Sequence, residues 1–333
     1  MTGTPLVAVV MIVRNEAGRV SRALTSVRNA VDTWLVIDTG SADATIEEIH
    51  SATAGWQGTL LKRPWVSFGE NRTELVQLAR ELKVAKWLMT IDADHVVEDA
   101  NLISASVNEA QKRGIDALLI PFTDVPTMWT IRLIRTDMSW SYVGVTREYI
   151  TCADPFACGK VHMPRIRDFA DGASRANKYR RDVEMLREEL SAAPENARSW
   201  FCLGDSYRGL HQHELAAVAY TNCAVKSQWD EERYVAITLS GEMLLAQGKT
   251  EEGLARLLQA NQERPRRREA LLMACQVLNK MGRHREVLTL LDGKSIRRPI
   301  PPQDILAIVP DAYGQAMALE RTIAEAALPR SNR

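Results

Sequence analysis

The sequence lacks both a long apolar run and an excess of either charge. No stretch reaches the ~18 consecutive apolar residues that a membrane-spanning helix needs. Lys+Arg and Asp+Glu number 42 each, so the formal net charge is zero. A zero balance argues against binding of polyanions by bulk charge, although it leaves a local basic patch open. The first residues carry no basic leader segment, so we expect a protein of the cytoplasm with no membrane contact.

Cysteine is also scarce, with five residues in the chain. An odd number set mostly among apolar neighbours does not suit a disulfide framework, so we expect reduced thiols in a cytoplasmic protein. Cys152, Cys158 and His162 suggest a zinc site, but the sequence offers no obvious fourth ligand.

The first half of the chain alternates strand and helix patterns. Residues 6–13 (LVAVVMIV) form a continuous apolar run, which is typical of a strand covered on both faces. Further strands are expected at 34–37, 60–61, 87–91, 117–121, 130–134 and 142–145, and helices at 20–31, 42–52 and 70–82. Such alternation predicts a Rossmann-like α/β domain over residues 1–170, with a mostly parallel sheet and helices on both faces.

The second half is helical and repeats. Trp200, Leu203, Gly204 and Tyr207 fit the tetratricopeptide pattern W-x2-L-G-x2-Y, which continues with Ala216 and Tyr220. Repeats are expected to start near 197, 234 and 268, after a lead-in helix at 179–191. We therefore predict an all-α tetratricopeptide-repeat domain over residues 171–333. The boundary lies near 165–178, where the polar segment 167–174 is either a linker or an ordered loop.

The strongest chemical signal is Asp92-Ala93-Asp94, at the end of an apolar strand. Residues i and i+2 of a strand point to the same face, so we expect the two carboxylates to converge at the carboxyl edge of the sheet. Adjacent negative charges favour a divalent cation with oxygen ligands, Mg²⁺ or Mn²⁺. Asp92 and Asp94 are therefore our candidate metal ligands, and the alternative is two solvated acids in a turn.

Polar residues after other elements are expected near the same edge. Asp38 ends the second strand, and Asn15 and Glu16 close the first. Arg72 is placed to reach a phosphate or nucleoside. The alternative roles are a helix cap for Asp38 and a surface cation for Arg72.

These segments together resemble the family 2 glycosyltransferases of GT-A fold, in particular the branch with C-terminal tetratricopeptide repeats. The resemblance covers roughly residues 6–310 and is carried by MIVRNE (11–16), VIDTGS (36–41), WVSFGENR (65–72), LMTIDAD (88–94), RLIR (132–135), WSYVGVTREY (140–149) and DGASRANKYRRD (171–182). It implies a GT-A nucleotide-sugar-binding domain, a UDP-sugar as donor and a divalent metal. It also implies that Asp38 contacts the base, Asp92 the ribose or metal, and Asp94 the metal.

The sequence departs from the family at two places. Asn71-Arg72-Thr73 replaces the usual Ala-Arg-Asn, so only Arg72 carries over. Arg147 stands where the family usually has a metal-binding histidine. Arginine stays protonated and cannot ligate a metal, but it can pair with the diphosphate directly. Otherwise His95 or His162 supplies the missing ligand.

Glu148 is the leading candidate for general base. A positioned carboxylate can accept the proton of an acceptor hydroxyl as the new bond forms, and the resemblance implies inversion at the anomeric carbon. The alternative is a structural ion pair with Arg147 or Arg135. Asp124 and Asp137 are the next candidates for the base.

The function we expect is a nucleotide-sugar-dependent hexosyltransferase acting on a macromolecular acceptor, with protein or peptide first and hydroxymethylated DNA bases as an alternative. A non-catalytic repeat scaffold with a degenerate transferase domain is the other interpretation. The sequence does not decide whether the protein forms a homodimer. Basic clusters occur at Lys178, Arg180 and Arg181 and at Arg264, Arg266, Arg267 and Arg268, and we expect them to be solvated helix faces or turns.

Overall fold

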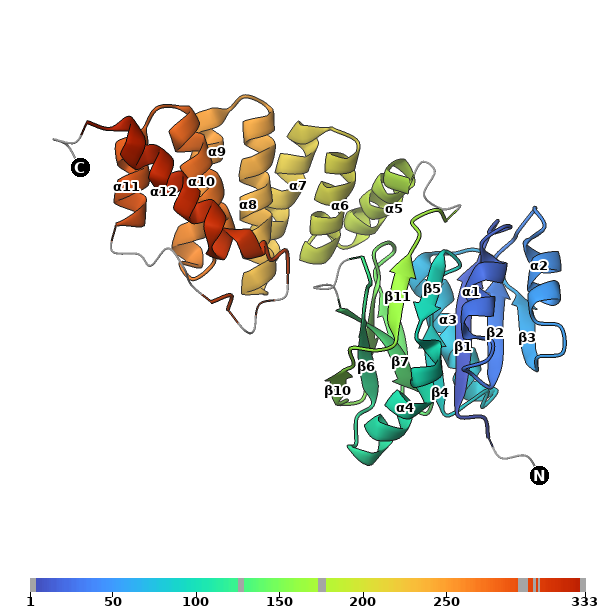
Figure 1. Cartoon of the computed structure of the whole chain (residues 1–333). Coiled ribbons are helices and arrows are strands. Elements are labelled where there is room, and N and C mark those ends of the chain that lie inside the picture. Colours follow the sequence, from blue (N-terminus) through green and yellow to red (C-terminus); the bar gives the residue numbers. More distant parts are fainter. Residues whose placement is uncertain are drawn as a thin grey trace. The chain divides into compact units, whose positions relative to one another are not determined.

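The computed structural model describes residues 4–124, 129–172, 178–292, 299–301, 304 and 306–329 (Figure 1). Ser174, which belongs to one of the motifs above, lies outside the described residues. The chain forms two compact units, Met1–Lys178 and Tyr179–Arg333. The sequence predicts a division at 170/171; residues up to Gly172 still contact the first unit, because the Gly172 amide donates to Asp94 Oδ2 at 3.2 Å.

The first unit is built on a seven-stranded, mostly parallel sheet of order β10-β6-β7-β4-β1-β2-β3. Its strands are β1 (Val7–Val13), β2 (Thr33–Asp38), β3 (Gly58–Lys62), β4 (Trp87–Thr90), β6 (Ala117–Pro121), β7 (Trp129–Arg135) and β10 (Cys158–Lys160). Strand β7 runs antiparallel to both β4 and β6, while the other pairs are parallel. The predicted α/β architecture is confirmed.

The continuous apolar run of β1 is explained by burial on both faces of the sheet. Val7, Val9 and Met11 belong to one core cluster, which also takes in residues of α1 (Val20–Val27), α2 (Thr45–Ala52) and α4 (Ile103–Lys112). Ala8 and Val10 belong to a second cluster on the other face, with residues of α3 (Phe68–Glu81). Alternate residues of one strand therefore supply two separate cores.

Two short antiparallel ribbons complete the first unit. Strand β5 (His95–Glu98) pairs with β11 (Arg165–Asp168), and β8 (Trp140–Val143) pairs with β9 (Tyr149–Cys152). Of these four strands the sequence predicts β8 alone, at 142–145; it ends earlier, and Gly144 follows at a φ of 104°. The two ribbons bring segments that are distant in sequence to the carboxyl edge of the main sheet.

The second unit is all helical, as predicted. Its helices are α5 (Lys178–Ala192), α6 (Ala197–Gly209), α7 (His213–Lys226), α8 (Asp230–Ala246), α9 (Thr250–Glu263), α10 (Glu269–Lys280), α11 (His284–Leu291) and α12 (Gln315–Ala327). The small residues of the repeat pattern mark close helix contacts: a Cβ at Gly204 would lie 2.7 Å from the Tyr220 ring. The small residues of the repeat pattern therefore indicate where two helices pack closely.

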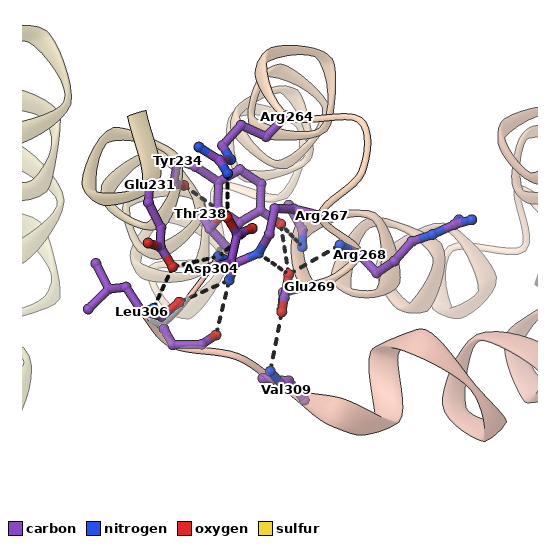
Figure 2. A network of polar contacts seen from close by, with 12 residues as sticks. Glu231, Tyr234, Thr238, Arg264, Arg267, Arg268, Glu269, Asp304, Leu306 and Val309 are labelled. Carbon is purple, nitrogen blue, oxygen red and sulfur yellow. Dashed lines mark hydrogen bonds and ion pairs between the residues drawn. The ribbon is translucent and has the colours of Figure 1, made fainter. Parts of the chain in front are cut away.

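The expectation that the Arg264–Arg268 cluster is solvated is wrong. Arg267 is 0% and Arg268 1% exposed, whereas Arg266 is exposed. Figure 2 shows Arg267 at the centre of a polar network, 2.9 Å from Glu269 and 3.3 Å from Glu231. Burial of the Arg267 cation is tolerated because carboxylates pair with it.

The same network contacts a segment that lies after α11 in the sequence. Its described residues are 304 and 306–309. Asp304 lies 2.6 Å from Arg264 and 3.5 Å from Arg267. Arg267 also donates to the carbonyl oxygen of Leu306 at 3.0 Å, and the amide of Val309 donates to Glu269 at 3.2 Å (Figure 2). We call this segment the strap. It joins the first turns of α8 and α10 to the chain that leads into α12.

None of the five cysteines forms a disulfide. Cys152 lies in β9 and Cys158 in β10, and neither belongs with His162 to a group that could hold a metal ion. The zinc-site hypothesis is therefore wrong. Across the described ranges, no helix combines the length and apolar character required to cross a membrane.

Candidate functional site

The centre of the site is Arg72, which bridges two of the predicted site acids. Its Nε lies 2.7 Å from Oε1 of Glu148, and a terminal nitrogen contacts Oδ1 of Asp92. The Arg72 side chain is 11% exposed. Burial alone would lower the pKa of Arg72, but the charges of Asp92 and Glu148 outweigh it and hold that pKa above its usual value. Arg72 is therefore a permanent cation shared between two carboxylates.

The loop that carries Glu148 is fixed against α3 by close backbone contact. Gly69, in the first turn of α3, leaves no room for a Cβ beside the Gly144 carbonyl. One turn further along α3, Thr73 accepts a hydrogen bond from the Tyr142 amide at 2.8 Å. These contacts align the β8–β9 ribbon with α3, so that Glu148 meets Arg72.

Asp92 is surrounded by nitrogen groups. Besides Arg72, Arg132 Nη1 lies 3.7 Å and His95 Nε2 3.5 Å from Asp92 Oδ2. Burial would raise the pKa of Asp92, but Arg72, His95 and Arg132 outweigh burial and hold it far below its usual range. Asp92 is thus a half-buried carboxylate held by two arginines.

The prediction that Asp92 and Asp94 share a face of one strand is wrong, because neither residue lies in a strand. Strand β4 ends at Thr90, and the Asp92 carbonyl accepts from the His95 amide at 3.0 Å. Both acids therefore lie in the turn between β4 and β5, where strand alternation does not apply. Asp92 turns to the arginines, and Asp94 belongs to a different group.

Asp94, His95 and Asp168 form that second group, with candidate ligand atoms all within 4.8 Å of one another. Asp168 comes from β11, whose pairing with β5 sets it opposite His95. Backbone amides orient both acids: Gly172 donates to Asp94 at 3.2 Å and Ala170 to Asp168 at 2.7 Å. The sequence reasoning missed Asp168 because it did not predict β11.

The donor set of this group fits a divalent cation. Two carboxylates suit Mn²⁺ or Mg²⁺, and an imidazole can serve as a third ligand only in its neutral form. Burial lowers the pKa of His95, which favours the neutral ring, although Asp92 opposes the effect. In this structure His95 Nδ1 accepts from the Asp92 amide at 3.2 Å. Ligation through Nδ1 would replace that bond.

Asn15, Glu16 and Asp38 lie where the sequence predicts, at the ends of the parallel pair β1 and β2. Asp38 is 2% exposed, and its Oδ1 accepts from the amides of Gly40 at 3.0 Å and Ser41 at 2.9 Å. Asp38 thus holds the β2–α2 turn but does not cap α2, which begins at Thr45, so the capping role weighed for it is not observed. A role in donor binding stays a prediction.

Asn15 and Glu16 attach that turn to the end of β1. Asn15, at a φ of 55°, accepts from the Ala42 amide at 2.8 Å through Oδ1. Glu16 is buried, and its amide donates to Thr45 Oγ1 at 2.7 Å. The two residues therefore shape the sheet edge next to Asp38.

The structure separates the remaining candidates. Arg147 is half-buried beside Glu148, at a φ of 49°. Asp124 is exposed beyond β6, at the carboxyl edge. Asp137 follows β7, whose antiparallel pairing with β4 carries it to the opposite edge, where it pairs with Arg135 at 2.6 Å. Asp137 is therefore not placed to act as the base.

Comparison with known proteins finds a family model that matches most of the first unit. Residues 8–161 match the model of the family described as "Glycosyl transferase family 2". An "Uncharacterized glycosyltransferase" of Rickettsia felis is 33% identical over 84 residues, 25% of this chain and 27% of that protein. A similarly named protein of Rickettsia bellii is 28% identical over 111 residues, 32% of this chain and 35% of that protein. The matched segment thus spans only about a quarter to a third of these relatives.

Solved structures with related architecture are more distant. S. aureus TarS covers 77% of this chain and 55% of its own length, at 11% identity and a TM-score of 0.46. A second TarS structure, of residues 1-349 in complex with UDP-GlcNAc, covers 78% of this chain and 92% of its own at 11% identity and a TM-score of 0.42. MamA MSR-1 covers 35% of this chain and 65% of its own at 21% identity and a TM-score of 0.30.

Proposed function

We propose that the chain transfers a hexosyl group from a UDP-sugar to a macromolecular acceptor, with inversion, because residues 8–161 match the model of glycosyl transferase family 2. The observation that supports this most is the bridge from Asp92 through Arg72 to Glu148. It brings a predicted donor-binding acid and the predicted base to one point, at the edge where open α/β sheets bind ligands.

Glu148 is the proposed general base. Its carboxylate lies 2.7 Å from the Arg72 guanidinium, and an ionised carboxylate can accept the proton of an acceptor hydroxyl during attack on the anomeric carbon. The bond to the sugar forms as the bond to the nucleoside diphosphate breaks, which inverts the configuration. Asp38, Asn15 and Glu16 shape the proposed nucleoside end of the site, and Arg72, Asp92 and Arg147 the phosphate end.

A divalent cation, Mn²⁺ or Mg²⁺, is proposed at Asp94, His95 and Asp168. Such an ion would offset the charge that develops on the leaving diphosphate. We assign Asp94 to this group and leave Asp92 out of it, because Arg72 already holds Asp92. Of the two predicted metal ligands, Asp92 and Asp94, the proposal keeps Asp94.

Protein or peptide is the proposed acceptor, since helical repeats form extended surfaces suited to a macromolecule. Burial of Arg267 and Arg268 removes both from any surface that could bind DNA. The proposed enzyme acts in the cytoplasm.

The test is transfer measured by mass spectrometry, with a panel of UDP-sugars and candidate acceptor peptides, with and without Mn²⁺. Glu148→Gln should lower the rate by ~10²–10⁴-fold, because the amide cannot accept a proton. Asp137→Asn, a carboxylate change at the opposite edge of the sheet, is the matched control and should retain the rate. A wild-type chain that neither transfers sugar nor binds UDP would overturn the proposal.

A further inference from the structure

We propose that Arg132 is a second diphosphate-binding residue, which together with Arg72 holds the two phosphates of the donor. This inference rests on the proposed function, since it names how the same site would hold its substrate. It concerns a residue that the sequence reasoning did not assign to any role. Its basis is where Arg132 lies and what its guanidinium contacts.

Arg132 is placed by β7 next to the end of β4. The register of the two strands pairs Leu133 with Met89, so Arg132 lies beside Thr90, just before the turn that carries Asp92. The Arg132 side chain is 14% exposed, and its guanidinium lies over the Phe122 ring at 5.7 Å. A long side chain is thus held against an aromatic wall and directed at the acids of the site.

The positive charge of Arg132 is only loosely paired with a carboxylate. Its Nε donates to Thr130 Oγ1 at 3.1 Å, and Nη1 lies 3.7 Å from Asp92. A charge-assisted hydrogen bond is typically about 2.7–2.9 Å long, so this ion pair is loose. In the part of the chain that the structure describes, no other ion pair with a carboxylate is found for Arg132.

Asp92 also serves Arg72, which contacts its other oxygen. Two guanidiniums therefore share Asp92, and among the described residues the ion pair of Glu148 is with Arg72. A mostly buried cation that retains hydrogen-bond donors is stabilised when an anion enters the site. The planar fork of arginine matches phosphate oxygens, so a nucleoside diphosphate is the anion that fits this edge of the sheet.

Arg135 is the natural control, because it lies on the same strand at the opposite end. It pairs with Asp116 at 2.9 Å and with Asp137 at 2.6 Å, at the edge away from the site. Replacing Arg135 changes the charge of β7 by the same amount without touching the proposed phosphate site.

The experiment is calorimetric titration of the full chain with UDP, uridine and pyrophosphate in one buffer that contains Mn²⁺. Arg132→Gln should weaken UDP binding by about 10- to 100-fold and leave uridine binding unchanged, as expected for loss of a charged hydrogen bond. Arg132→Lys keeps the charge but not the fork, so we expect an intermediate loss. Arg135→Gln should bind UDP as the wild type does. Pyrophosphate binding should weaken in parallel with UDP.

Two results would overturn the inference. One is wild-type UDP affinity in Arg132→Gln. The other is an equal loss of UDP and uridine affinity in that variant, which is the result of a purely structural ion pair with Asp92. If Arg132→Gln does not fold, the test uses Arg132→Lys instead. Loss of UDP affinity without loss of uridine affinity in that variant supports the inference, and an equal loss of both refutes it. A wild-type chain that binds uridine but not UDP refutes the arginine site alone, whereas one that binds neither contradicts the proposed function as well.

Discussion

The two units of the chain each contain a buried arginine cluster, and the clusters differ in how completely their charges are paired. In the second unit Arg267 is 0% exposed and is surrounded by Glu231, Glu269 and Asp304, all within 3.5 Å. In the first unit Arg132 reaches its only described carboxylate partner, Asp92, at 3.7 Å. In the second unit the chain itself supplies close carboxylate partners for Arg267. In the first unit Arg132 is left to pair with the anion of the proposed ligand.

The comparison separates two uses of a buried charge. Closed pairing of Arg267 offsets the cost of desolvation and fixes neighbouring segments in place. Loose pairing at Arg132 costs stability and is characteristic of a binding site, since the missing partner arrives with the ligand. The degree of pairing therefore distinguishes the two clusters better than burial does.

The largest expected effect is on the closed cluster. Arg267→Met leaves three buried carboxylates with fewer cations, and breaking such a network typically costs about 3–5 kcal/mol. Urea unfolding followed by the helical circular dichroism signal should show the loss. Arg266→Met, the exposed neighbour in the same run, should change stability by less than about 0.5 kcal/mol. Equal midpoints for both variants would refute the structural role of Arg267.

A smaller effect is expected at the proposed metal group. A Cβ on Gly172 would lie 2.8 Å from Asp94 Oδ2, so Gly172→Ala should displace that carboxylate. Mn²⁺ binding, measured by calorimetry, should weaken by ~10–100-fold, the usual cost of disturbing the surroundings of a ligand. Gly314→Ala is the control, because a Cβ there would meet nothing within 4 Å. Unchanged Mn²⁺ affinity in Gly172→Ala would remove Asp94 from the metal group.

The smallest effect is expected at the ribbon that carries Asp168. Hydrogen bonds from Thr123 and Arg167 lower the pKa of Glu98. The ionised form is therefore favoured by folding, and its contribution is present above the unfolded pKa of ~4.3 and lost as pH falls through the lower folded pKa.

Glu98→Gln removes this contribution, so the free energy of unfolding of the variant should fall less than that of the wild type as the pH is lowered. The expected difference is ~0.2–1 kcal/mol, the range of exposed ion pairs. Thermal unfolding between about pH 5 and pH 3 measures the slope. Glu109→Gln, an exposed residue of α4, should leave the slope as in the wild type. An unchanged slope in Glu98→Gln would show that this carboxylate does not stabilise the ribbon.

The sequence predicts well where physical constraints are local. The apolar run of β1 identifies a strand buried on both faces, and the Gly204 and Tyr220 positions identify packed helix pairs. The sequence does not predict the association of Arg72 with Asp92 and Glu148 as an ion network, because that association depends on contact between α3 and the β8–β9 ribbon.

Long-range pairing accounts for the errors. Asp168 joins Asp94 only because β11 pairs with β5, and each of these four-residue strands offers too little pattern to be recognised. The prediction of a solvated Arg267 is wrong because Asp304, one of its partners, lies beyond two further helices in the sequence. A charge cluster read from the sequence alone does not reveal the acids that will pair with it.

The strap also has a consequence for how the protein is synthesised. Glu231 accepts from the amide of Leu306, which follows it by 75 residues. When Glu231, Arg267 and Glu269 leave the ribosome, their strap partners have not yet emerged from it. The first turns of α8 and α10 can reach their final pairing only after residue 309 has emerged, so the last stage of folding of this unit must follow synthesis of the strap.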